Sequence, residues 1–274
     1  MQRLRSILIV SSRRDPASSS IAQALIAKNR FEQESGRGIE SYSKGDIRLV
    51  VLEKLGIYVE PSDIPSDVST AIFVSKHVSS SGRPALTVHA TGNLAKEAKF
   101  GGNPEELSHV DPLIIRRTLR ALKEGVSQTG VQIDITMEAT HHGPTNLSMP
   151  VCFVEIGSGL AEWTDPVLGE IAANAIMAAS TKVEETYPAA VGFGGTHYSA
   201  KHTRISMEGD YAIGHLVSSH SFEGGVSPKV IGDTFNKTIG SCNTAIVDWK
   251  GLHSNDRRNL IASLEAAGRD IVRC

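Results

Sequence analysis

Short apolar runs that alternate with helix patterns constrain the fold of this chain more than any other feature of its sequence. Nine runs rich in valine and isoleucine predict strands, at Leu4 to Val10, Ile47 to Leu52, Ala71 to Ser75, Ala85 to Thr91, Val131 to Met137, Val151 to Gly157, Ala189 to Gly194, Tyr211 to Ser218 and Asn243 to Trp249. Some of these runs are continuously apolar and others alternate with polar residues, which favours a mixed sheet.

Helix patterns with capping residues lie between several of these runs. Four helices are predicted: Ile21 to Lys28 after Ser19 or Ser20, Leu113 to Glu124 after Asp111-Pro112, Val167 to Val183 after Asp165-Pro166, and Arg257 to Ala267 after Ser254. Alternating strands and helices predict an α/β fold, a three-layer α/β/α sandwich with a mixed sheet. The polar stretch Glu32 to Gly45 is expected to be a surface loop. Because no repeat or long linker divides the chain, we expect one domain over residues 1–274.

Charge and composition exclude several classes of function. Lys and Arg number 28 against 30 Asp and Glu, a formal charge of −2, so any nucleic-acid contact must use a local patch. Aromatic residues make up only 5%, so base stacking is not expected. Three widely spaced cysteines, Cys152, Cys242 and Cys274, favour a reducing compartment and a cytoplasmic location. The apolar run Ile7 to Val10 is too short for a signal peptide or a membrane span.

Six of the ten histidines fall where a predicted strand gives way to a turn: His77, His89, His141, His142, His197 and His215. Ligands of α/β sheets bind beyond the carboxyl ends of strands, and imidazoles and carboxylates are zinc ligands. No His-Glu-x-x-His helix or Cys-x-x-Cys pair occurs, so the residues alone leave open a zinc site with scattered ligands and histidines that are only structural. The absence of Walker A, Gly-x-Gly-x-x-Gly and Gly-x-Ser-x-Gly sequences argues against nucleotide-phosphate binding and a serine hydrolase.

Three segments carry a more specific signal. They are Val88-His89-Ala90-Thr91-Gly92-Asn93, Glu138-Ala139-Thr140-His141-His142-Gly143-Pro144-Thr145 and Gly194-Gly195-Thr196-His197-Tyr198. In this order and spacing the chain resembles the archaeal and plant type of D-aminoacyl-tRNA deacylase, over nearly its whole length. The resemblance implies hydrolysis of the ester that joins a D-amino acid to tRNA, a requirement for Zn²⁺, and a phosphorylase/hydrolase-like fold.

On this resemblance we assign expected roles to residues of the three segments and their neighbours. The expected zinc ligands are His141, His142, His197 and Glu155. Glu138 is expected to take a proton from the attacking water, and His89 to protonate the leaving hydroxyl. The expected substrate-binding residues are Thr91, Gly194, Gly195, Thr196 and His215, with the glycine amides open to the ligand.

A basic face of the predicted helix Leu113 to Glu124 is the candidate tRNA contact. Arg116, Arg120 and Lys123 lie at i, i+4 and i+7, so they share one face, although a merely solvated face is the alternative. The expected partner is D-aminoacyl-tRNA, as substrate in translation quality control, with no membrane and no stable protein partner, and the chain is expected to be a monomer. Two other functions stay open: a zinc peptidase or amidohydrolase of small acylated substrates, and a metal-free tRNA-binding module.

Overall fold

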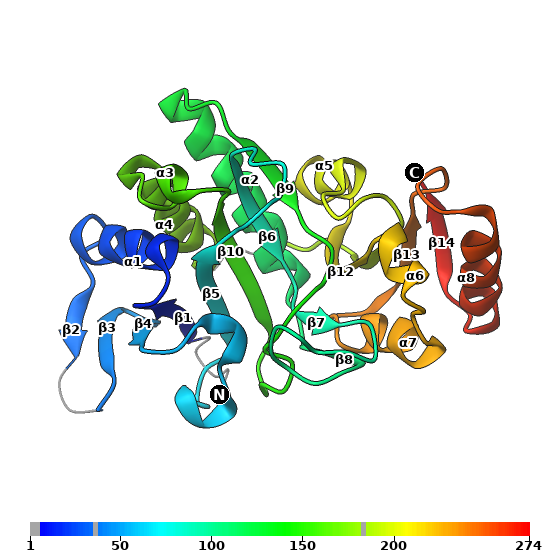
Figure 1. Cartoon of the computed structure of the whole chain (residues 1–274), viewed down its shortest axis with the longest axis horizontal. Coiled ribbons are helices and arrows are strands. Elements are labelled where there is room, and N and C mark those ends of the chain that lie inside the picture. The colour runs from blue at the N-terminus through cyan, green and yellow to red at the C-terminus, as the bar shows by residue number, and fades with distance from the viewer. Residues whose placement is uncertain (1–5, 35–37, 182–184) are drawn as a thin grey trace.

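Two β-sheets lie side by side along the long axis of the molecule, with helices packed around and between them (Figure 1). The computed structural model describes residues 6–34, 38–181 and 185–274. The predicted α/β architecture with a mixed sheet is confirmed, because the larger sheet has eight strands in both parallel and antiparallel pairs. The sequence did not predict that the last strands would form a second sheet.

The large sheet has the strand order β2-β3-β4-β1-β5-β10-β6-β9. Its strands are β1 (Ile7–Ser12), β2 (Glu32–Glu34), β3 (Glu40–Lys44), β4 (Ile47–Leu52), β5 (Thr70–Lys76), β6 (Ala85–His89), β9 (Asp134–Met137) and β10 (Val151–Gly157). The pairs β1–β4, β1–β5, β5–β10 and β6–β9 are parallel, whereas β10 and β6 are antiparallel. The residues at or just after the carboxyl ends of β5, β6 and β9 are His77, His89 and Glu138, which belong to the candidate site described below.

The second sheet has four parallel strands in the order β12-β11-β13-β14. They are β11 (Ala189–Phe193), β12 (Ala212–Val217), β13 (Cys242–Val247) and β14 (Asp270–Arg273). A two-stranded hairpin of β7 (Gly92–Asn93) and β8 (Glu106–Leu107) follows β6. The predicted strand ranges of both sheets agree with the structure to within three residues at most ends.

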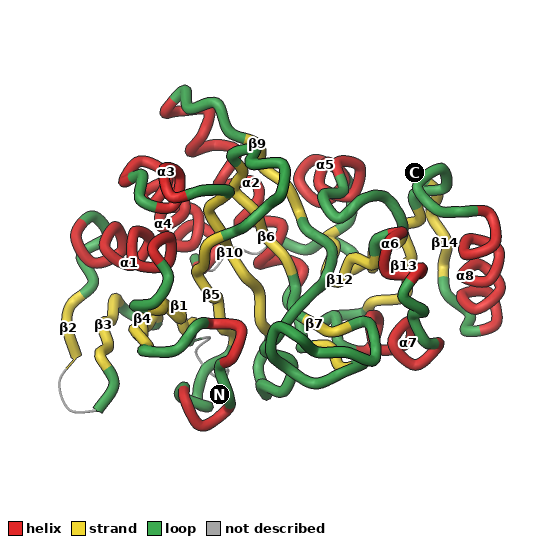
Figure 2. The backbone as a smooth tube through the Cα atoms, viewed as in Figure 1, coloured by secondary structure: helices red, strands yellow, loops and turns green. Residues whose placement is uncertain are grey.

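The helices form the layers around the sheets (Figure 2). They are α1 (Pro16–Ala27), α2 (Pro112–Thr129), α3 (Leu160–Trp163), α4 (Pro166–Ser180), α5 (Ala200–Glu208), α6 (Ser219–Glu223), α7 (Pro228–Asn236) and α8 (Ser254–Ala266), with short 3₁₀ helices η1 (Gly56–Tyr58) and η2 (Pro61–Asp63). Three of them start with an aspartate followed by proline, because the carboxylate caps free backbone N–H groups and proline needs no donor in the first turn. None of the described helices is both long and apolar enough to span a bilayer.

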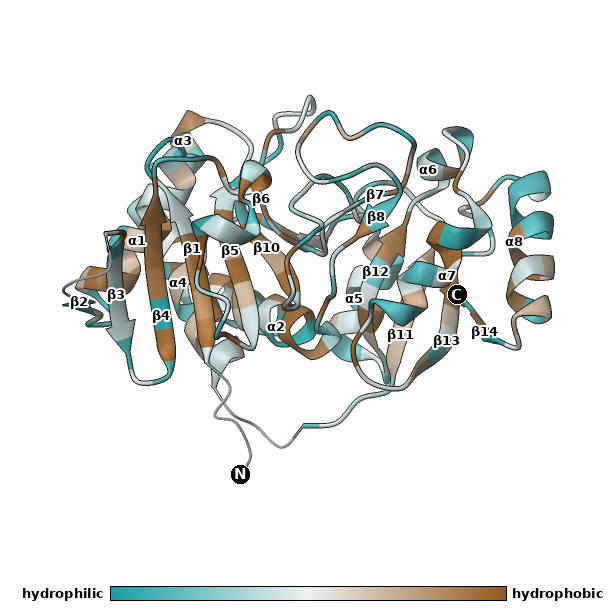
Figure 3. Ribbon diagram, turned by 90° about the horizontal axis from the view of Figure 1, so that it is seen from below, coloured by the Kyte–Doolittle hydropathy of each residue, from teal (hydrophilic) through white to brown (hydrophobic). Residues whose placement is uncertain are grey.

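One hydrophobic core connects the two sheets. Its buried residues include Ile9 and Val154 of the large sheet, Ile115 of α2, and Ile213 and Ile246 of the second sheet. Helix α2 packs against β6 of the large sheet and also against β12 of the second sheet. Figure 3 shows the hydrophobic residues concentrated in the central strands of both sheets. A core shared by both sheets is consistent with the expected single domain, which stays a prediction.

The structure corrects two local predictions. The stretch Glu32 to Gly45 is not simply a loop, because β2 and β3 form an antiparallel pair there that extends the sheet beyond β4. Helix α1 begins earlier than predicted: its N-cap is Asp15, whose Oδ1 accepts a hydrogen bond from the Ser18 amide at 3.0 Å. Residues 4 and 5 of the first predicted strand, 182 and 183 of the third predicted helix, and 35–37 of the predicted loop lie outside the described residues.

Candidate active site

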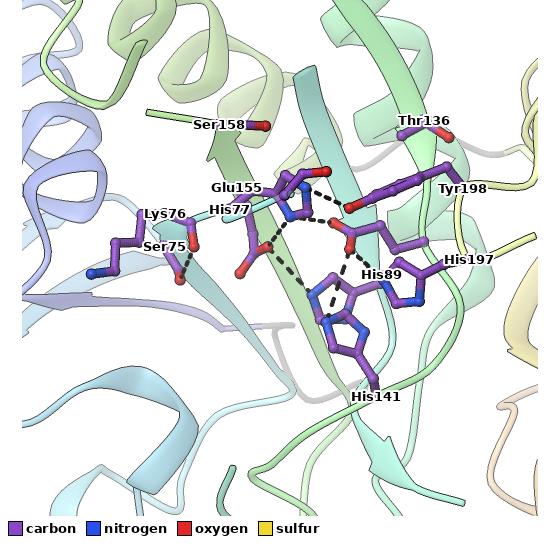
Figure 4. A network of polar contacts seen from close by, with 12 residues as sticks. Ser75, Lys76, His77, His89, Thr136, His141, Glu155, Ser158, His197 and Tyr198 are labelled. Atoms are coloured by element: carbon purple, nitrogen blue, oxygen red, sulfur yellow. Dashed lines mark hydrogen bonds and ion pairs between the residues drawn. The ribbon is translucent and has the colours of Figure 1, made fainter. Parts of the chain in front are cut away.

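A single irregular segment that follows β9 brings the two sheets together and carries the adjacent histidines. The Glu138 amide donates to the Val88 carbonyl of the large sheet at 3.1 Å. The next two amides donate toward the second sheet, Ala139 to the His197 carbonyl at 2.8 Å and Thr140 to the Leu216 carbonyl at 2.7 Å. Residues from β6 and β10, from the turn after β5 and from the loop after β11 therefore meet around this segment. The side chains of His77, Glu155 and His197 point toward one another there (Figure 4).

Three imidazoles converge within this site. A ring nitrogen from each of His89, His141 and His142 lies within 4.8 Å of the other two. In each ring Nδ1 faces a backbone carbonyl, that of Ala90 at 3.1 Å, Ala139 at 2.8 Å and Gly143 at 2.7 Å, respectively. Because a carbonyl only accepts, Nδ1 must be the donor, so in the neutral rings Nε2 carries the lone pair. Nε2 of His89 is buried and has no hydrogen-bond partner, as expected of a metal ligand.

The electrostatics of two of these rings favour the neutral form. Burial and the neighbouring imidazoles His89 and His142 hold the pKa of His141 well below its ordinary value. Burial, followed by the charge of His89, lowers the pKa of His142 to about 4. A metal ion requires neutral imidazole, so these two rings need not lose a proton near pH 7 in order to bind it.

Two buried carboxylates lie beside the imidazoles. Glu138 accepts from Nε2 of His197 at 2.8 Å, and its Oε1 lies 3.2 Å from Nδ1 of His77. Glu155 lies 3.5 Å from the same His77 nitrogen and 3.8 Å from Nε2 of His89. Two further groups of potential ligands result, Glu138 with His141 and His197, and His77 with Glu138 and Glu155.

These carboxylates are ionised although they are buried. Burial alone would raise the pKa of both groups, but hydrogen bonds from His197 and His77 hold that of Glu138 well below its usual range. Burial is likewise outweighed at Glu155, where His77 and the nearby His89 ring lower the pKa to about 2. Burial by itself would lower the pKa of His77. The two carboxylates outweigh burial and raise the pKa of His77 to about 10. Without a metal, His77 is therefore a cation that faces both carboxylates. At His89 burial lowers the pKa, but Glu155 and Glu138 outweigh it and raise the pKa above its ordinary value.

The four residues predicted as one zinc-ligand set are not brought together as one set. His141 and His142 share one group with His89. His141 and His197 share a second group with Glu138, and Glu155 lies in a third with His77 and Glu138. Glu138, predicted as the base, belongs to two of these groups, and His89, predicted as the acid, belongs to the third. His77 was expected at a strand end but had no predicted role, because its partners Glu138, Glu155 and Tyr198 come from three separate segments.

Tyr198 is a second residue of the site to which the sequence analysis gave no role. Its hydroxyl lies 2.9 Å from Nε2 of His77, and the two rings meet edge to face. A cavity of about 510 Å³ opens on this side and is lined by both residues. A second cavity, of about 430 Å³, is also lined by Tyr198, together with Thr196 and Lys201 at the carboxyl end of the second sheet.

The predicted substrate-binding residues differ in how free their polar groups are. Thr91 is buried and donates to the Pro144 carbonyl at 2.7 Å. The amides of Gly194 and Gly195 donate to the carbonyls of Val217 and Gly251, so they are not open to a ligand as expected. Thr196 is exposed and lines the cavity beside Tyr198.

His215 is enclosed by the protein. Its Nδ1 lies 3.1 Å from the Thr140 hydroxyl and its Nε2 lies 3.1 Å from the Ser108 carbonyl. Burial lowers its pKa to about 4. With both ring nitrogens engaged, His215 connects the segment after β9 to the second sheet instead of facing a substrate.

The predicted basic face of α2 is only partly a surface. Arg116 does not fit the prediction of phosphate contact: it is 2% exposed, it donates to the Ser206 carbonyl, and its guanidinium stacks 3.6 Å from the centre of the Tyr187 ring. Arg120 and Lys123 are exposed, but they pair with Glu185 and Glu208 at 2.8 and 2.5 Å. A tRNA contact at these two residues stays a prediction.

A family model and the curated relatives name the same family. A family model described as D-aminoacyl-tRNA deacylase matches residues 64–272. The D-aminoacyl-tRNA deacylase of Aeropyrum pernix is 34% identical, covering 97% of this chain and 98% of that protein. That of Methanosarcina acetivorans is also 34% identical, covering 97% and 92%. The crystal structure of a conserved protein of unknown function matches with a TM-score of 0.89 and 29% identity, over 98% of this chain and 95% of that one.

The buried state of His215 predicts a pH dependence of stability. An unfolded histidine titrates near its ordinary pKa of 6.5, whereas the native His215 titrates near 4. Between these pH values only the unfolded chain gains a proton here, so the free energy of unfolding falls as pH falls, by up to about 1.4 kcal/mol per pH unit. The slope of the free energy of unfolding against pH gives the number of protons that the chain takes up on unfolding. In urea unfolding of metal-free protein between pH 4 and 6.5, we expect His215→Gln to lower this number by close to one.

The exposed His220, whose side chain is 88% accessible, provides the matched control. His220→Gln should leave the slope of stability against pH unchanged between pH 4 and 6.5. An unchanged slope in His215→Gln would show that His215 is already protonated in the native protein.

Proposed function

The chain belongs to the D-aminoacyl-tRNA deacylase family and is a hydrolase of ester bonds, and from this premise we propose that it cleaves D-aminoacyl-tRNA in a zinc-dependent reaction that releases the D-amino acid and tRNA. The observation that carries the zinc requirement is the convergence of His89, His141 and His142, each fixed through Nδ1 by a backbone carbonyl. Such carbonyl contacts set the tautomer of metal-binding histidines in general.

We assign the zinc to these three imidazoles, which replaces part of the ligand set expected from the sequence. Three protein ligands with an open fourth position are typical of catalytic zinc. When bound, zinc polarises an ester carbonyl and lowers the pKa of water. His89 is fully buried, so it suits a ligand better than the acid that must reach a leaving ribose oxygen.

Glu138 is the proposed proton acceptor. It is ionised, lies 3.9 Å from Nε2 of His141, and is buried beside the proposed zinc ligands. In the reaction the water oxygen bonds to the ester carbon, and Glu138 takes the water proton. The ester bond to the ribose oxygen then breaks.

His197 is the proposed proton donor to that ribose oxygen, through Nδ1, because its Nε2 is held by Glu138. Its Nε2 is hydrogen-bonded to Glu138 at 2.8 Å, and 39% of its side chain is exposed, so it connects the buried carboxylate to the open side of the site. The cycle closes when Glu138 releases the water proton to solvent and His197 takes one up on its exposed side. Glu155 and His77 form the charged pair behind these groups and hold Glu138 in place.

A cytoplasmic location and a role in translation quality control form part of the same proposal, because aminoacyl-tRNA is made where proteins are synthesised. A monomer without a stable protein partner stays a prediction.

The first test compares matched D- and L-aminoacyl-tRNA with and without a chelator. We expect hydrolysis of the D-ester, loss of activity with the chelator, and recovery on adding Zn²⁺. A peptidase or amidohydrolase would instead cleave N-acyl substrates without needing tRNA, and a metal-free binding module would bind tRNA with no turnover. Either outcome would contradict the proposed function.

A second test separates the proton acceptor from the zinc ligands. Glu138→Gln preserves the shape of the side chain but removes its basicity, so we expect full zinc content and turnover lower by about 100-fold or more. The control Glu223→Gln removes a surface carboxylate whose side chain is 54% exposed, and it should behave as wild type. If Glu138→Gln loses its zinc, Glu138 is itself a ligand.

A further inference from the structure

Three aromatic side chains are conspicuously exposed in the described part of the chain. They are Tyr58 at 46%, Phe100 at 62% and Tyr198 at 36%. Tyr198 belongs to the site itself through its contact with His77. Phe100 and Tyr58 have no role in the site described above, although the hydrophobic effect favours covering rings of this size.

Phe100 is held next to the metal-site histidines by its backbone. The carbonyl of Phe100 accepts from the amide of Gly143, the residue after His142, at 3.0 Å. A β-carbon on Gly143 would lie 2.4 Å from the carbonyl carbon of Gly101, so only glycine permits this approach. The loop that carries Phe100 therefore packs directly on the turn that carries His142.

The same loop is anchored on its other side. The Asn93 side chain donates to the Gly101 carbonyl at 2.8 Å, and the Asn103 amide donates to the Thr145 hydroxyl at 2.9 Å. The exposure of the Phe100 ring is therefore set by a loop that is hydrogen-bonded on both flanks.

Tyr58 lies on the neighbouring backbone. Gly101 has φ of 79°, and a β-carbon there would lie 1.8 Å from the Ile57 carbonyl oxygen and 3.3 Å from Cδ1 of Tyr58. This glycine allows η1, the Phe100 loop and the His142 turn to stack as three adjacent segments. The two segments that carry the exposed rings of Tyr58 and Phe100 thus adjoin the turn that carries His142.

The loop that carries Phe100 also carries exposed positive charges. Lys96 and Lys99 are exposed on it. Lys99 pairs with Glu97 at 2.8 Å, whereas Lys96 has no ion pair among the residues that the structure describes. Exposed aromatic rings beside lysines are typical of surfaces that bind single-stranded nucleic acid, with bases on the rings and phosphates near the cations.

We propose that Tyr58 and Phe100 form a stacking platform for the unpaired bases at the 3′ end of the tRNA, an inference that rests on the proposed function. The ester lies on the terminal ribose of a single strand, so the preceding nucleotides must leave the histidine site along one of its flanks. The Tyr58–Phe100 flank offers them π-faces that fit any base. Base stacking was not expected from the low aromatic content, but two of the three exposed rings are carried by segments that adjoin the His142 turn.

The kinetic test uses Phe100→Ala and Tyr58→Ala with D-aminoacyl-tRNA. Loss of one base–aromatic stack should raise KM about tenfold, and kcat should change less than about twofold, because the contact is the same in ground and transition states. Phe100→Trp, which keeps an aromatic ring at this position, should have the KM of wild type. Leu160→Ala, at an equally exposed residue of α3 (66%), is the control and should leave KM unchanged.

The binding test is independent of turnover. We expect the trinucleotide CCA, without an amino acid, to quench the tryptophan fluorescence of the Phe100→Trp protein. The same titration should leave the fluorescence of wild type, which has only its two native tryptophans, unchanged. Phe100→Ala should weaken CCA binding without changing the slope of log affinity against log salt, whereas Lys96→Ala should reduce that slope by about one or less.

The outcomes separate this inference from the proposed function. If wild type hydrolyses D-aminoacyl-tRNA but Phe100→Ala and Tyr58→Ala leave KM and CCA affinity unchanged, the stacking platform is refuted and the deacylase function stands. If wild type shows no hydrolysis, the proposed function fails first. If the same variants instead change the molecular mass in light scattering, the rings form a contact between two copies of the chain, which would also overturn the proposal.

Discussion

The hydrogen bonds of the segment after β9 are the constraint on which the rest of the site depends. Its three successive amides, from Glu138 to Thr140, donate first to the large sheet and then to the second sheet. This places Glu138 in the seam between the sheets and turns the following histidines back toward His89. The same segment packs against the Phe100 loop, so the chemistry and the proposed nucleotide flank share one support.

Sequence patterns predicted the parts of the fold that depend on local signals. The ranges of β4 and β10 were predicted to the residue, because continuous apolar runs between polar ends indicate buried strands. The Asp-Pro starts of α2 and α4 were found from capping chemistry, and the same signal at Asp15-Pro16 was overlooked. The polar strands β2 and β3 could not be predicted, because their order comes from pairing at a sheet edge and not from buried side chains.

The candidate site was predicted in its residue types but not in its grouping. Histidines at strand ends indicated where the candidate site lies, yet which of them share a ligand group depends on contacts between distant segments. His89 was predicted as a proton donor, but it is buried and is now proposed as a ligand. Arg116 was predicted on the surface, but its contacts with Ser206 and Tyr187 bury it. Such changes follow from tertiary packing, which a single sequence does not display.

Anomalous diffraction at the zinc edge from crystals of the zinc-loaded protein tests the central claim most directly. The account predicts a peak about 2.0–2.1 Å from Nε2 of each of His89, His141 and His142, with Glu138 outside bonding distance. A strongest peak between Glu138, His141 and His197, or between His77, Glu138 and Glu155, would contradict it, as would crystals that bind no zinc at this seam.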